Sequence, residues 1–258
     1  MATIALTGAA SGIGAATRDR LRREGHHVIG VDLRGAEIDA DLSHPGGRHE
    51  AVEAVRNMSG GKLDGLVVCA GLGPQVRDHR AIVSVNYFGA QALLAGLRDC
   101  LEKGDRPAAV AISSNSSRIP GLESPVVDAC LDGDEERARA EAAERGGVFA
   151  YAGSKLALAR WVRRAATRPD WAGCGIRLNA IAPGATLTPL LQAGLDDPEH
   201  AESIKAFPVP LSGTGAYGRP EDIAAAVVFL LGPDAAFCCG TVLYVDGGSD
   251  ALIRPDEY

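Results

Sequence analysis

The chain has 258 residues, 46% of them hydrophobic and 23% charged, so it can bury one large core, and we expect a single domain over residues 1–258. Its formal net charge of −7 disfavours nucleic acid as a partner, because that binding requires clustered Lys and Arg to neutralise phosphates. The six cysteines lack metal-ligand spacing, so we expect no metal site. No apolar run approaches the roughly 18 residues of a membrane span, so we expect no membrane anchor and a cytoplasmic protein.

Short β-branched or apolar runs alternate along the chain with longer stretches of helical spacing. The expected strands are Thr3–Thr7, His27–Val31, Leu63–Cys69, Ala108–Ser113, Arg177–Ile181 and Thr241–Val245. The intervening stretches carry apolar residues three or four positions apart, as at Ala90, Leu93 and Leu97, which is typical of helices that cover a sheet. This alternation predicts βαβ units and hence an α/β fold, a doubly wound parallel sheet of Rossmann type flanked by helices.

A glycine-rich turn follows the first expected strand and opens a helix. Its characteristic residues are Gly8, Ser11, Gly12, Ile13 and Gly14. Glycines let the backbone turn sharply and approach a pyrophosphate, and the helix N-terminus offers unpaired N–H groups and a partial positive charge. The turn therefore predicts a phosphate site, although similar turns also close strand–helix junctions that bind no ligand.

An acidic residue, Asp32, ends the second expected strand, 18 positions after Gly14. A carboxylate near this spacing accepts hydrogen bonds from the adenosine ribose hydroxyls and repels a 2′-phosphate, so we predict NAD as cofactor in preference to NADP. The nearby Arg34 is the competing feature, because an arginine at this place can contact a 2′-phosphate. We interpret it instead as a solvated loop residue.

Two stretches interrupt the regular alternation. Residues Asn115–Gly147 separate an expected strand from the next helix, and their charged run Asp132–Arg145 predicts an inserted, exposed helix. Residues Leu187–Tyr217 are rich in proline, a composition typical of a lid over a substrate site.

Tyr151 and Lys155 begin the helical segment after the insertion and, four residues apart, are expected on one helix face. A phenol with an ordinary pKa of about 10 is a poor base near neutral pH, but a neighbouring ammonium favours the phenolate and makes proton exchange with an alcohol feasible. Taken alone, the pair also fits an ordinary exposed Tyr and Lys.

The glycine turn, Asp32 and the Tyr151–Lys155 pair together resemble the short-chain dehydrogenase/reductase family, over nearly the whole chain. The resemblance implies further cofactor-binding positions, namely Asp41, Leu42, Ala70, Gly71, Pro183, Gly184, Thr186 and Thr188, besides Tyr151 and Lys155. Cys69 departs from the family, which usually has Asn at this place. Because the small residues after it are kept, we expect cofactor binding to be retained.

The resemblance also implies the catalytic residues. Ser114 matches the serine that hydrogen-bonds the substrate oxygen, and Asn86 matches a helix asparagine that holds a water in a proton relay. Tyr151 then removes the hydroxyl proton while the hydride passes to the nicotinamide. Lys155 holds the nicotinamide ribose and keeps the pKa of Tyr151 low.

Several runs resemble, within that family, its bacterial 3α-hydroxysteroid dehydrogenase/carbonyl reductase branch. These runs are Cys69–Gln75, Val83–Ala90, Pro183–Leu195 and Val245–Gly248. The likeness implies 3α-hydroxysteroids, 3-ketosteroids and smaller apolar ketones as substrates, in a pocket walled by Ile119–Pro125 and Leu187–Phe207. Such loops vary freely among enzymes of one mechanism, so a cyclic monoterpene or another alicyclic alcohol stays open. A dinucleotide-binding regulator without turnover is a third alternative, which the presence of all four catalytic residues disfavours.

Family members form dimers or tetramers through helices that flank the tyrosine-bearing segment. We expect Asp132–Arg145 to obstruct or replace that interface and so to favour a homodimer over a tetramer. A solvated helix without a role in assembly is the alternative.

Overall fold

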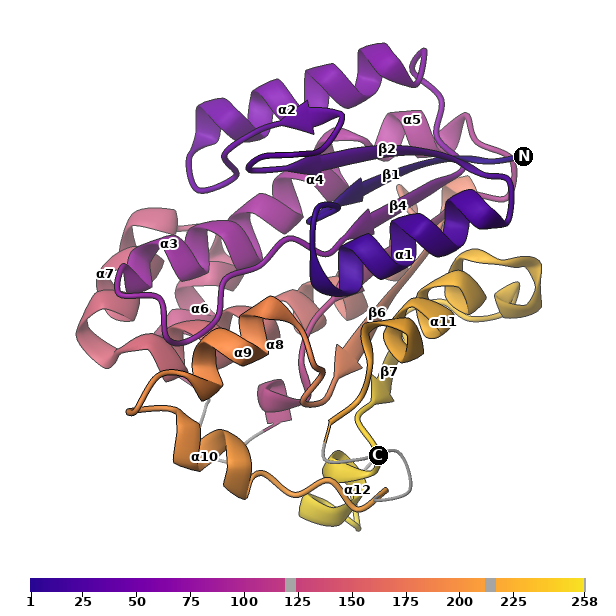
Figure 1. Ribbon diagram of the computed structural model, residues 1–258. Helices are drawn as coiled ribbons and strands as arrows, with labels where there is room; N and C mark the ends of the chain where they lie inside the picture. The colour runs from indigo at the N-terminus through magenta and orange to yellow at the C-terminus, as the bar shows by residue number, and fades with distance from the viewer. Residues whose placement is uncertain (119–123, 212–216, 258) are drawn as a thin grey trace.

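The structure is a computed structural model that describes residues 1–118, 124–211 and 217–257. Its centre is a seven-stranded parallel sheet with the strand order β3-β2-β1-β4-β5-β6-β7 (Figure 1). The strands are β1 (Thr3–Thr7), β2 (His27–Asp32), β3 (Ile38–Asp39), β4 (Gly65–Val68), β5 (Ala108–Ile112), β6 (Arg177–Pro183) and β7 (Val242–Val245). This arrangement confirms the predicted doubly wound α/β fold of Rossmann type.

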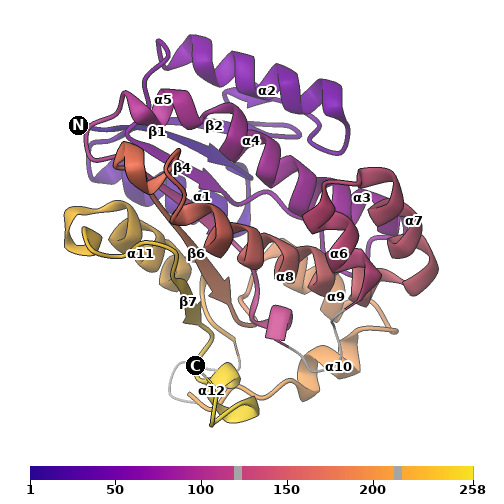
Figure 2. The ribbon, with the colours of Figure 1, turned by 180° about the vertical axis from the view of Figure 1, so that it is seen from behind.

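Helices cover both faces of the sheet (Figures 1 and 2). One face carries α1 (Gly12–Arg23) and α11 (Pro220–Leu231), and the other carries α2 (Pro45–Met58), α4 (Ala90–Gly96) and α8 (Gly147–Ala166). Apolar residues of these helices pack onto the strands and form two buried clusters, one on each face. The shorter elements are α3 (His79–Val83), η1 (Ser84–Gly89), α5 (Arg98–Glu102), η2 (Asn115–Arg118), η3 (Ala172–Cys174), α9 (Pro189–Leu195), α10 (Ala201–Ala206) and η5 (Pro233–Ala235). Within the described ranges, no helix combines the length and the apolar character needed to cross a membrane.

The winding of the sheet reverses at β1. The chain passes from β1 outward to β2 and β3, and then returns to place β4 on the other side of β1. Thr7, at the carboxyl end of β1, pairs with Val31 of β2 and Val68 of β4, so the three strands end together. Ligands of such sheets bind outside the carboxyl ends of the strands at this reversal.

The strand boundaries agree with the predicted ones in most cases to within one residue. β4 is shorter at both ends than the predicted Leu63–Cys69. β6 continues beyond the predicted Ile181 to Pro183, because its last residues pair with β7. β3 is not among the predicted strands, since two residues are too few to show an alternating pattern.

The predicted insertion forms two helices, α6 (Pro125–Asp132) and α7 (Glu135–Arg145), where one was predicted. α6 buries one face through Val126, Val127, Ala129 and Cys130. α7 packs on α3, α6 and α8 with Ala138 and Ala142 fully buried. The prediction of an exposed helix over Asp132–Arg145 is therefore wrong for one side of α7. The many charged residues of this run predicted exposure, but Ala138 and Ala142, four residues apart, form a narrow buried face.

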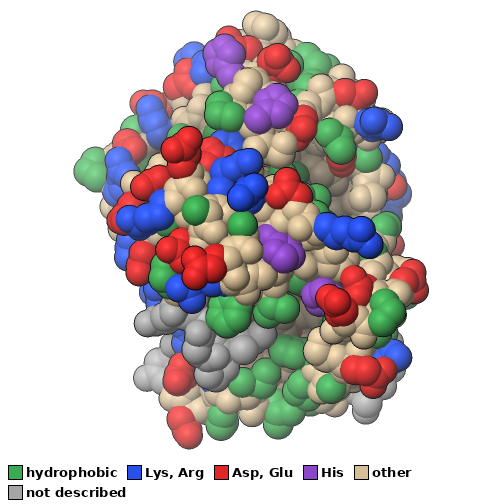
Figure 3. Space-filling view, turned by 90° about the vertical axis from the view of Figure 1, so that its left-hand side faces the viewer, with side chains coloured by type: hydrophobic (Ala, Val, Ile, Leu, Met, Phe, Trp, Pro, Cys, Tyr) green, Lys and Arg blue, Asp and Glu red, His purple; other side chains and the backbone are tan. Residues whose placement is uncertain are grey.

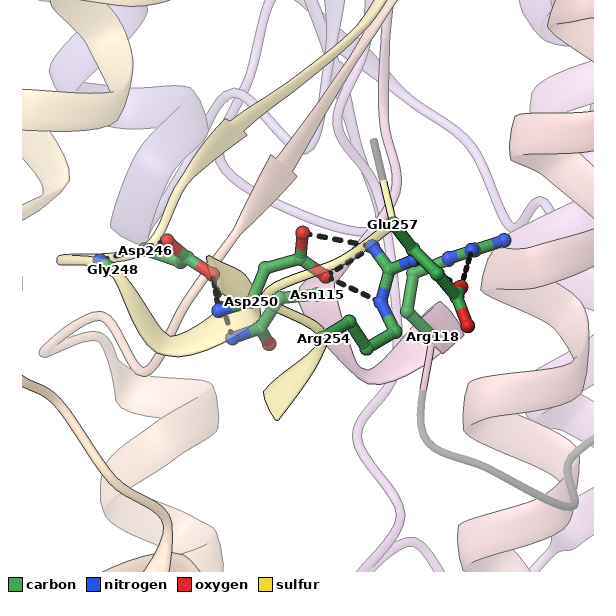
Figure 4. Close-up of polar contacts among 7 residues, drawn as sticks. All are labelled: Asn115, Arg118, Asp246, Gly248, Asp250, Arg254 and Glu257. Atoms are coloured by element: carbon green, nitrogen blue, oxygen red, sulfur yellow. Dashed lines mark hydrogen bonds and ion pairs between the residues drawn. The ribbon is translucent and has the colours of Figure 1, made fainter. Parts of the chain in front are cut away.

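A polar network fastens the C-terminal helix α12 (Ser249–Ile253) to η2 (Figure 4). The side chain of Arg254 is 8% exposed and donates to both carboxylate oxygens of Asp250, at 2.6 and 2.8 Å. Arg254 also donates to Glu257 at 2.8 Å, and Glu257 accepts a second hydrogen bond from Arg118 of η2 at 2.9 Å. The network holds the last described residues of the chain against the segment that follows β5.

Candidate active site

A cavity of about 700 Å³ opens at the carboxyl edge of the sheet, beside the reversal at β1. Figure 3 looks toward this side of the molecule and shows hydrophobic side chains around a hollow in its lower half. Nearly all residues predicted to bind cofactor or to act in catalysis line this cavity: Gly8, Ser11, Gly12, Ile13, Gly14, Asp32, Asp41, Leu42, Ala70, Gly71, Ser114, Tyr151, Lys155, Pro183, Gly184, Thr186 and Thr188. Its volume falls within the range of small-molecule and cofactor pockets.

The glycine turn brings the N-terminus of α1 close to the end of β1. Gly8 has a φ of +71°, and a Cβ built on Gly14 would lie 1.9 Å from the carbonyl oxygen of Gly8. Only glycine fits at Gly14 without moving one of the two segments. The first turn of α1 carries no acidic residue, so its N–H groups face the cavity without a competing carboxylate and can bind an anion.

Asp32 lies at the end of β2, beside the glycine turn. Its Oδ2 accepts a hydrogen bond from the backbone N–H of Ala10 at 2.9 Å, and its Oδ1 accepts one from Leu33 at 2.7 Å. These bonds fix the carboxylate while each oxygen keeps a further lone pair for a ribose hydroxyl. Arg34 is exposed, and the described residues that line the cavity do not include it.

The three predicted catalytic residues that line the cavity come from the end of β5 and from α8. They are Ser114, Tyr151 and Lys155. The Ser113 hydroxyl donates to the backbone carbonyl of Lys155 at 2.8 Å, which ties β5 to α8. Ser114 instead forms a side-chain hydrogen bond with Tyr151, and its Oγ accepts from the Ser116 hydroxyl at 2.9 Å. The two neighbouring serines therefore differ: Ser113 makes a structural bond, and Ser114 lies beside the phenol.

The pKa of Tyr151 lies above its usual value. Burial raises the pKa of this phenol, and the hydrogen bond with Ser114 lowers it by less. This direction is opposite to the prediction that Lys155 keeps the pKa of Tyr151 low. The Lys155 Nζ donates to the backbone carbonyl of Ile112 at 2.8 Å, and burial lowers the pKa of Lys155 itself to about 8.

Asn86 is fully buried in η1, a π-helical turn, just beneath the cavity. Its side chain pairs with the backbone of Leu72, accepting from the N–H at 2.7 Å and donating to the carbonyl at 3.0 Å. A Cβ built on Gly71 would lie 3.2 Å from Asn86 Oδ1 and 3.3 Å from Lys155 Nζ, so both polar atoms border Gly71. Asn86 thus braces the loop after β4 next to the lysine. Its predicted place in a proton relay stays a prediction.

The segment after β6 lines the cavity beside the glycine turn, because a Cβ built on Gly12 would lie 3.2 Å from Thr188 Cγ2. Thr186 donates its hydroxyl to the carbonyl of Gly184 at 3.0 Å, which closes a tight turn. Thr188 begins α9, and its Oγ1 accepts from the N–H of Leu191 at 3.2 Å. That bond uses a lone pair of the Thr188 oxygen, so the hydroxyl proton is available to a ligand in the cavity that Thr188 lines.

The remaining wall is mainly apolar and comes from α9, α10 and the start of α8. Among the residues of this wall are Leu190, Leu191, Ile204 and Phe207, all within the predicted Leu187–Phe207 wall. Of the other predicted wall, Ile119–Pro125, residues 119–123 lie outside the described residues. Residues 212–216 of the predicted lid also lie outside them.

Val148 and Gln75 line the cavity although the sequence did not single them out for that role. Val148 lies three residues before Tyr151 on the same helix face, and that spacing could have identified it. Gln75 donates to the carbonyl of Leu190 at 3.2 Å and so joins the loop after β4 to α9. That contact spans 115 positions of sequence, and no local pattern predicts it.

Two family models match the chain. One is described as short chain dehydrogenase and matches residues 2–126, and the other is described as Enoyl-(Acyl carrier protein) reductase and matches residues 135–250. The first match includes the glycine turn, and the second includes the helix that bears Tyr151 and Lys155.

Individual proteins match over almost the whole chain. A 3-alpha-hydroxysteroid dehydrogenase/carbonyl reductase from Comamonas testosteroni is 46% identical, with 100% of both chains covered. A cis-4-hydroxycyclohexanecarboxylate dehydrogenase from Sinomonas cyclohexanicum is 31% identical, with 96% of both covered. Among solved structures, a 3-alpha-hydroxysteroid dehydrogenase from Pseudomonas sp. B-0831 complexed with NADH matches with a TM-score of 0.96 at 51% identity, covering 99% of this chain and 100% of that one.

Proposed function

Because the chain belongs to the short-chain dehydrogenase/reductase family, we propose that it is an NAD-dependent oxidoreductase that interconverts a secondary alcohol and a ketone by hydride transfer. The observation that carries the proposal is the meeting of Ser114, Tyr151 and Lys155 in one cavity with the glycine turn. The substrates we propose are 3α-hydroxysteroids, 3-ketosteroids and other apolar carbonyl compounds.

The cavity fits a dinucleotide along the carboxyl edge of the sheet. The first turn of α1 offers N–H groups to the pyrophosphate, and Asp32 offers carboxylate oxygens to the adenosine ribose. Asp41 and Leu42 border the place for the adenine, and the segment from Pro183 to Thr188 borders that for the nicotinamide.

The catalytic residues then divide the work of alcohol oxidation. NAD bound in the cavity supplies the nicotinamide carbon that accepts the hydride. Tyr151 takes the hydroxyl proton at its phenolate oxygen, while the Ser114 hydroxyl hydrogen-bonds the substrate oxygen and orients it. Lys155 holds the ribose hydroxyls, and Asn86 helps to pass the proton from the buried site toward solvent.

We expect alcohol oxidation to become faster as pH rises, whereas ketone reduction changes little until pH approaches the raised pKa of Tyr151. Burial raises the pKa of Tyr151, so the phenol is protonated at neutral pH and is ready to donate to a ketone. Oxidation needs the phenolate, whose fraction grows as pH approaches the raised pKa. Values of kcat/KM measured in both directions from about pH 6 to 10 check this. An oxidation rate that falls with pH over that range would contradict it.

We expect kcat/KM for NAD to exceed that for NADP by about 100-fold, because Asp32 would lie against the 2′-phosphate of NADP. Asp32→Ala should reduce this ratio strongly. Asp234→Ala is the matched control, since Asp234 is an exposed carboxylate of η5 outside the described cavity lining and should leave the ratio unchanged. A preference of the unaltered protein for NADP would overturn the role given to Asp32.

The steroid assignment is supported by the apolar wall of the cavity and by the full-length likeness to hydroxysteroid dehydrogenases. The alternative is a cyclic monoterpene or another alicyclic alcohol, which the likeness to a cyclohexane-carboxylate dehydrogenase favours. Reduction of NAD, followed with androsterone and with a set of cyclic monoterpene alcohols, separates the two. Activity on the monoterpene alcohols alone would remove the steroid assignment.

A regulator that binds a dinucleotide without turnover is the remaining alternative. Transfer of isotope from labelled NADH to a ketone supports the oxidoreductase. NADH binding without any transfer to the ketones of the same panel would instead support the regulator.

We also propose that the protein acts as a homodimer in the cytoplasm. α7 packs beside α8, the tyrosine-bearing helix, so it lies next to the surface through which family members pair. The six cysteines are free thiols, which suits a reducing compartment. Light scattering that finds a stable tetramer would reject the dimer.

A further inference from the structure

We infer that Arg48 and Glu135 form a positioning pair through which the inserted helix α7 sets the affinity for the adenosine half of the cofactor. The inference rests on the proposed function, because it assumes that the loop Asp41–Ser43 receives the adenine. It assigns a role in cofactor binding to a helix that does not line the cavity in the described structure.

The pair is a partly buried, two-point contact between α2 and α7. Arg48 Nη1 donates to Glu135 Oε2 at 2.7 Å, and Nη2 donates to Oε1 at 2.6 Å. The Arg48 side chain is 7% exposed and that of Glu135 is 22% exposed. Burial raises the pKa of Glu135, but the hydrogen bonds from Arg48 and Ser84, together with the charges of Arg48 and Arg139, outweigh it and hold the pKa below its usual value. The contact is therefore a charged pair at neutral pH.

The same guanidinium holds the loop that borders the adenine site. Arg48 Nε donates to the carbonyl of Leu42 at 2.8 Å, and Nη2 donates to the carbonyl of Ser43 at 3.3 Å. Leu42 and Ser43 line the cavity. Since the guanidinium is rigid and planar, Glu135 fixes its orientation and thereby fixes the positions of both carbonyls.

α7 holds a second segment through Ser84, the first residue of η1. The Ser84 carbonyl accepts from Arg48 Nη2 at 3.1 Å, and the Ser84 hydroxyl accepts from Arg139 of α7 at 2.9 Å. η1 packs against the adenine loop, because a Cβ built on Gly89 would lie 3.2 Å from the Cβ of Leu42. Two charged residues of α7 thus hold the two adjoining segments beneath the adenine end of the cavity.

The matched pair of variants is Glu135→Gln and Glu136→Gln. Glu135→Gln keeps the shape of the side chain but removes the charge that orients Arg48, whereas Glu136 is an exposed neighbour on the same helix. The dissociation constants of NADH, AMP and nicotinamide mononucleotide are measured by titration. We expect Glu135→Gln to raise the dissociation constants of NADH and AMP by about tenfold. The dissociation constant of nicotinamide mononucleotide and the kcat at saturating NAD should stay unchanged. Glu136→Gln should change none of them.

If the Arg48–Glu135 pair only stabilises the fold, the thermal stability of Glu135→Gln falls, and its affinities for all three ligands stay the same or fall by the same factor. Either of these results would overturn the inference. If Glu135→Gln fails to fold, Arg48→Met combined with Glu135→Leu removes both charges without leaving one buried alone, and the same selective loss of AMP affinity is expected. Failure of the unaltered protein to bind NADH would overturn the proposed function as well. Unchanged AMP affinity in variants of a protein that binds NADH would overturn this inference alone.

Discussion

Tyr151→Phe is expected to lower kcat by a factor of about 10³–10⁴, while the dissociation constant of NADH changes little. The phenol oxygen is the group that exchanges a proton with the substrate, and Phe keeps the ring that packs beside the cofactor site. Ser114 loses its side-chain partner in this variant but keeps its bond with Ser116. Steady-state rates with a 3α-hydroxysteroid, together with NADH fluorescence titration, give the two quantities.

The matched control for this change is Tyr87→Phe. Tyr87 is 3% exposed and packs edge-on against Phe88, away from the described cavity lining, so its variant loses a phenol oxygen without touching the site. It should turn over at nearly the normal rate. Near-normal turnover by Tyr151→Phe itself would refute the catalytic assignment.

Gly14→Ala is expected to weaken NADH binding by about 100-fold. The added Cβ would lie 1.9 Å from the carbonyl oxygen of Gly8, so α1 must move away from the glycine turn. This movement displaces the N–H groups that bind the pyrophosphate, and hydrogen bonds to a charged group contribute about 1.5–3 kcal/mol each. NADH titration measures the loss, and circular dichroism checks that the sheet and helices are retained.

Gly46→Ala is the control for the glycine substitution. Gly46 lies in the first turn of α2, and the nearest atom to an added Cβ is 3.5 Å away, which is an ordinary contact. We expect normal NADH affinity from this variant. Equal affinities in Gly14→Ala and Gly46→Ala would mean that the glycine turn does not bind the pyrophosphate.

The cofactor side of the site could be predicted from the sequence because its parts are local. Gly8 and Gly14 belong to one turn, and Asp32 follows directly from a buried strand whose boundaries are clear. Tyr151 and Lys155 are likewise fixed relative to each other by one helical turn. Parallel strands then bring these separate local signals to a common edge.

The parts that escaped prediction depend on packing between distant segments. Arg48 and Glu135 are 87 positions apart, and α7 showed mostly charge because its buried stripe consists of alanine. The pKa of Tyr151 was predicted in the wrong direction, because the helical spacing of Tyr151 and Lys155 does not reveal how deeply the phenol is buried.

The network around Arg254 has a practical consequence for anyone who wishes to attach a purification tag or a fusion partner. Glu257 accepts hydrogen bonds from Arg118 and Arg254, so a bulky partner joined close behind it would compete for the space beside the segment that follows β5. Met1 is fully exposed and precedes β1 at the opposite, amino edge of the sheet (Figure 1). A tag belongs at that end.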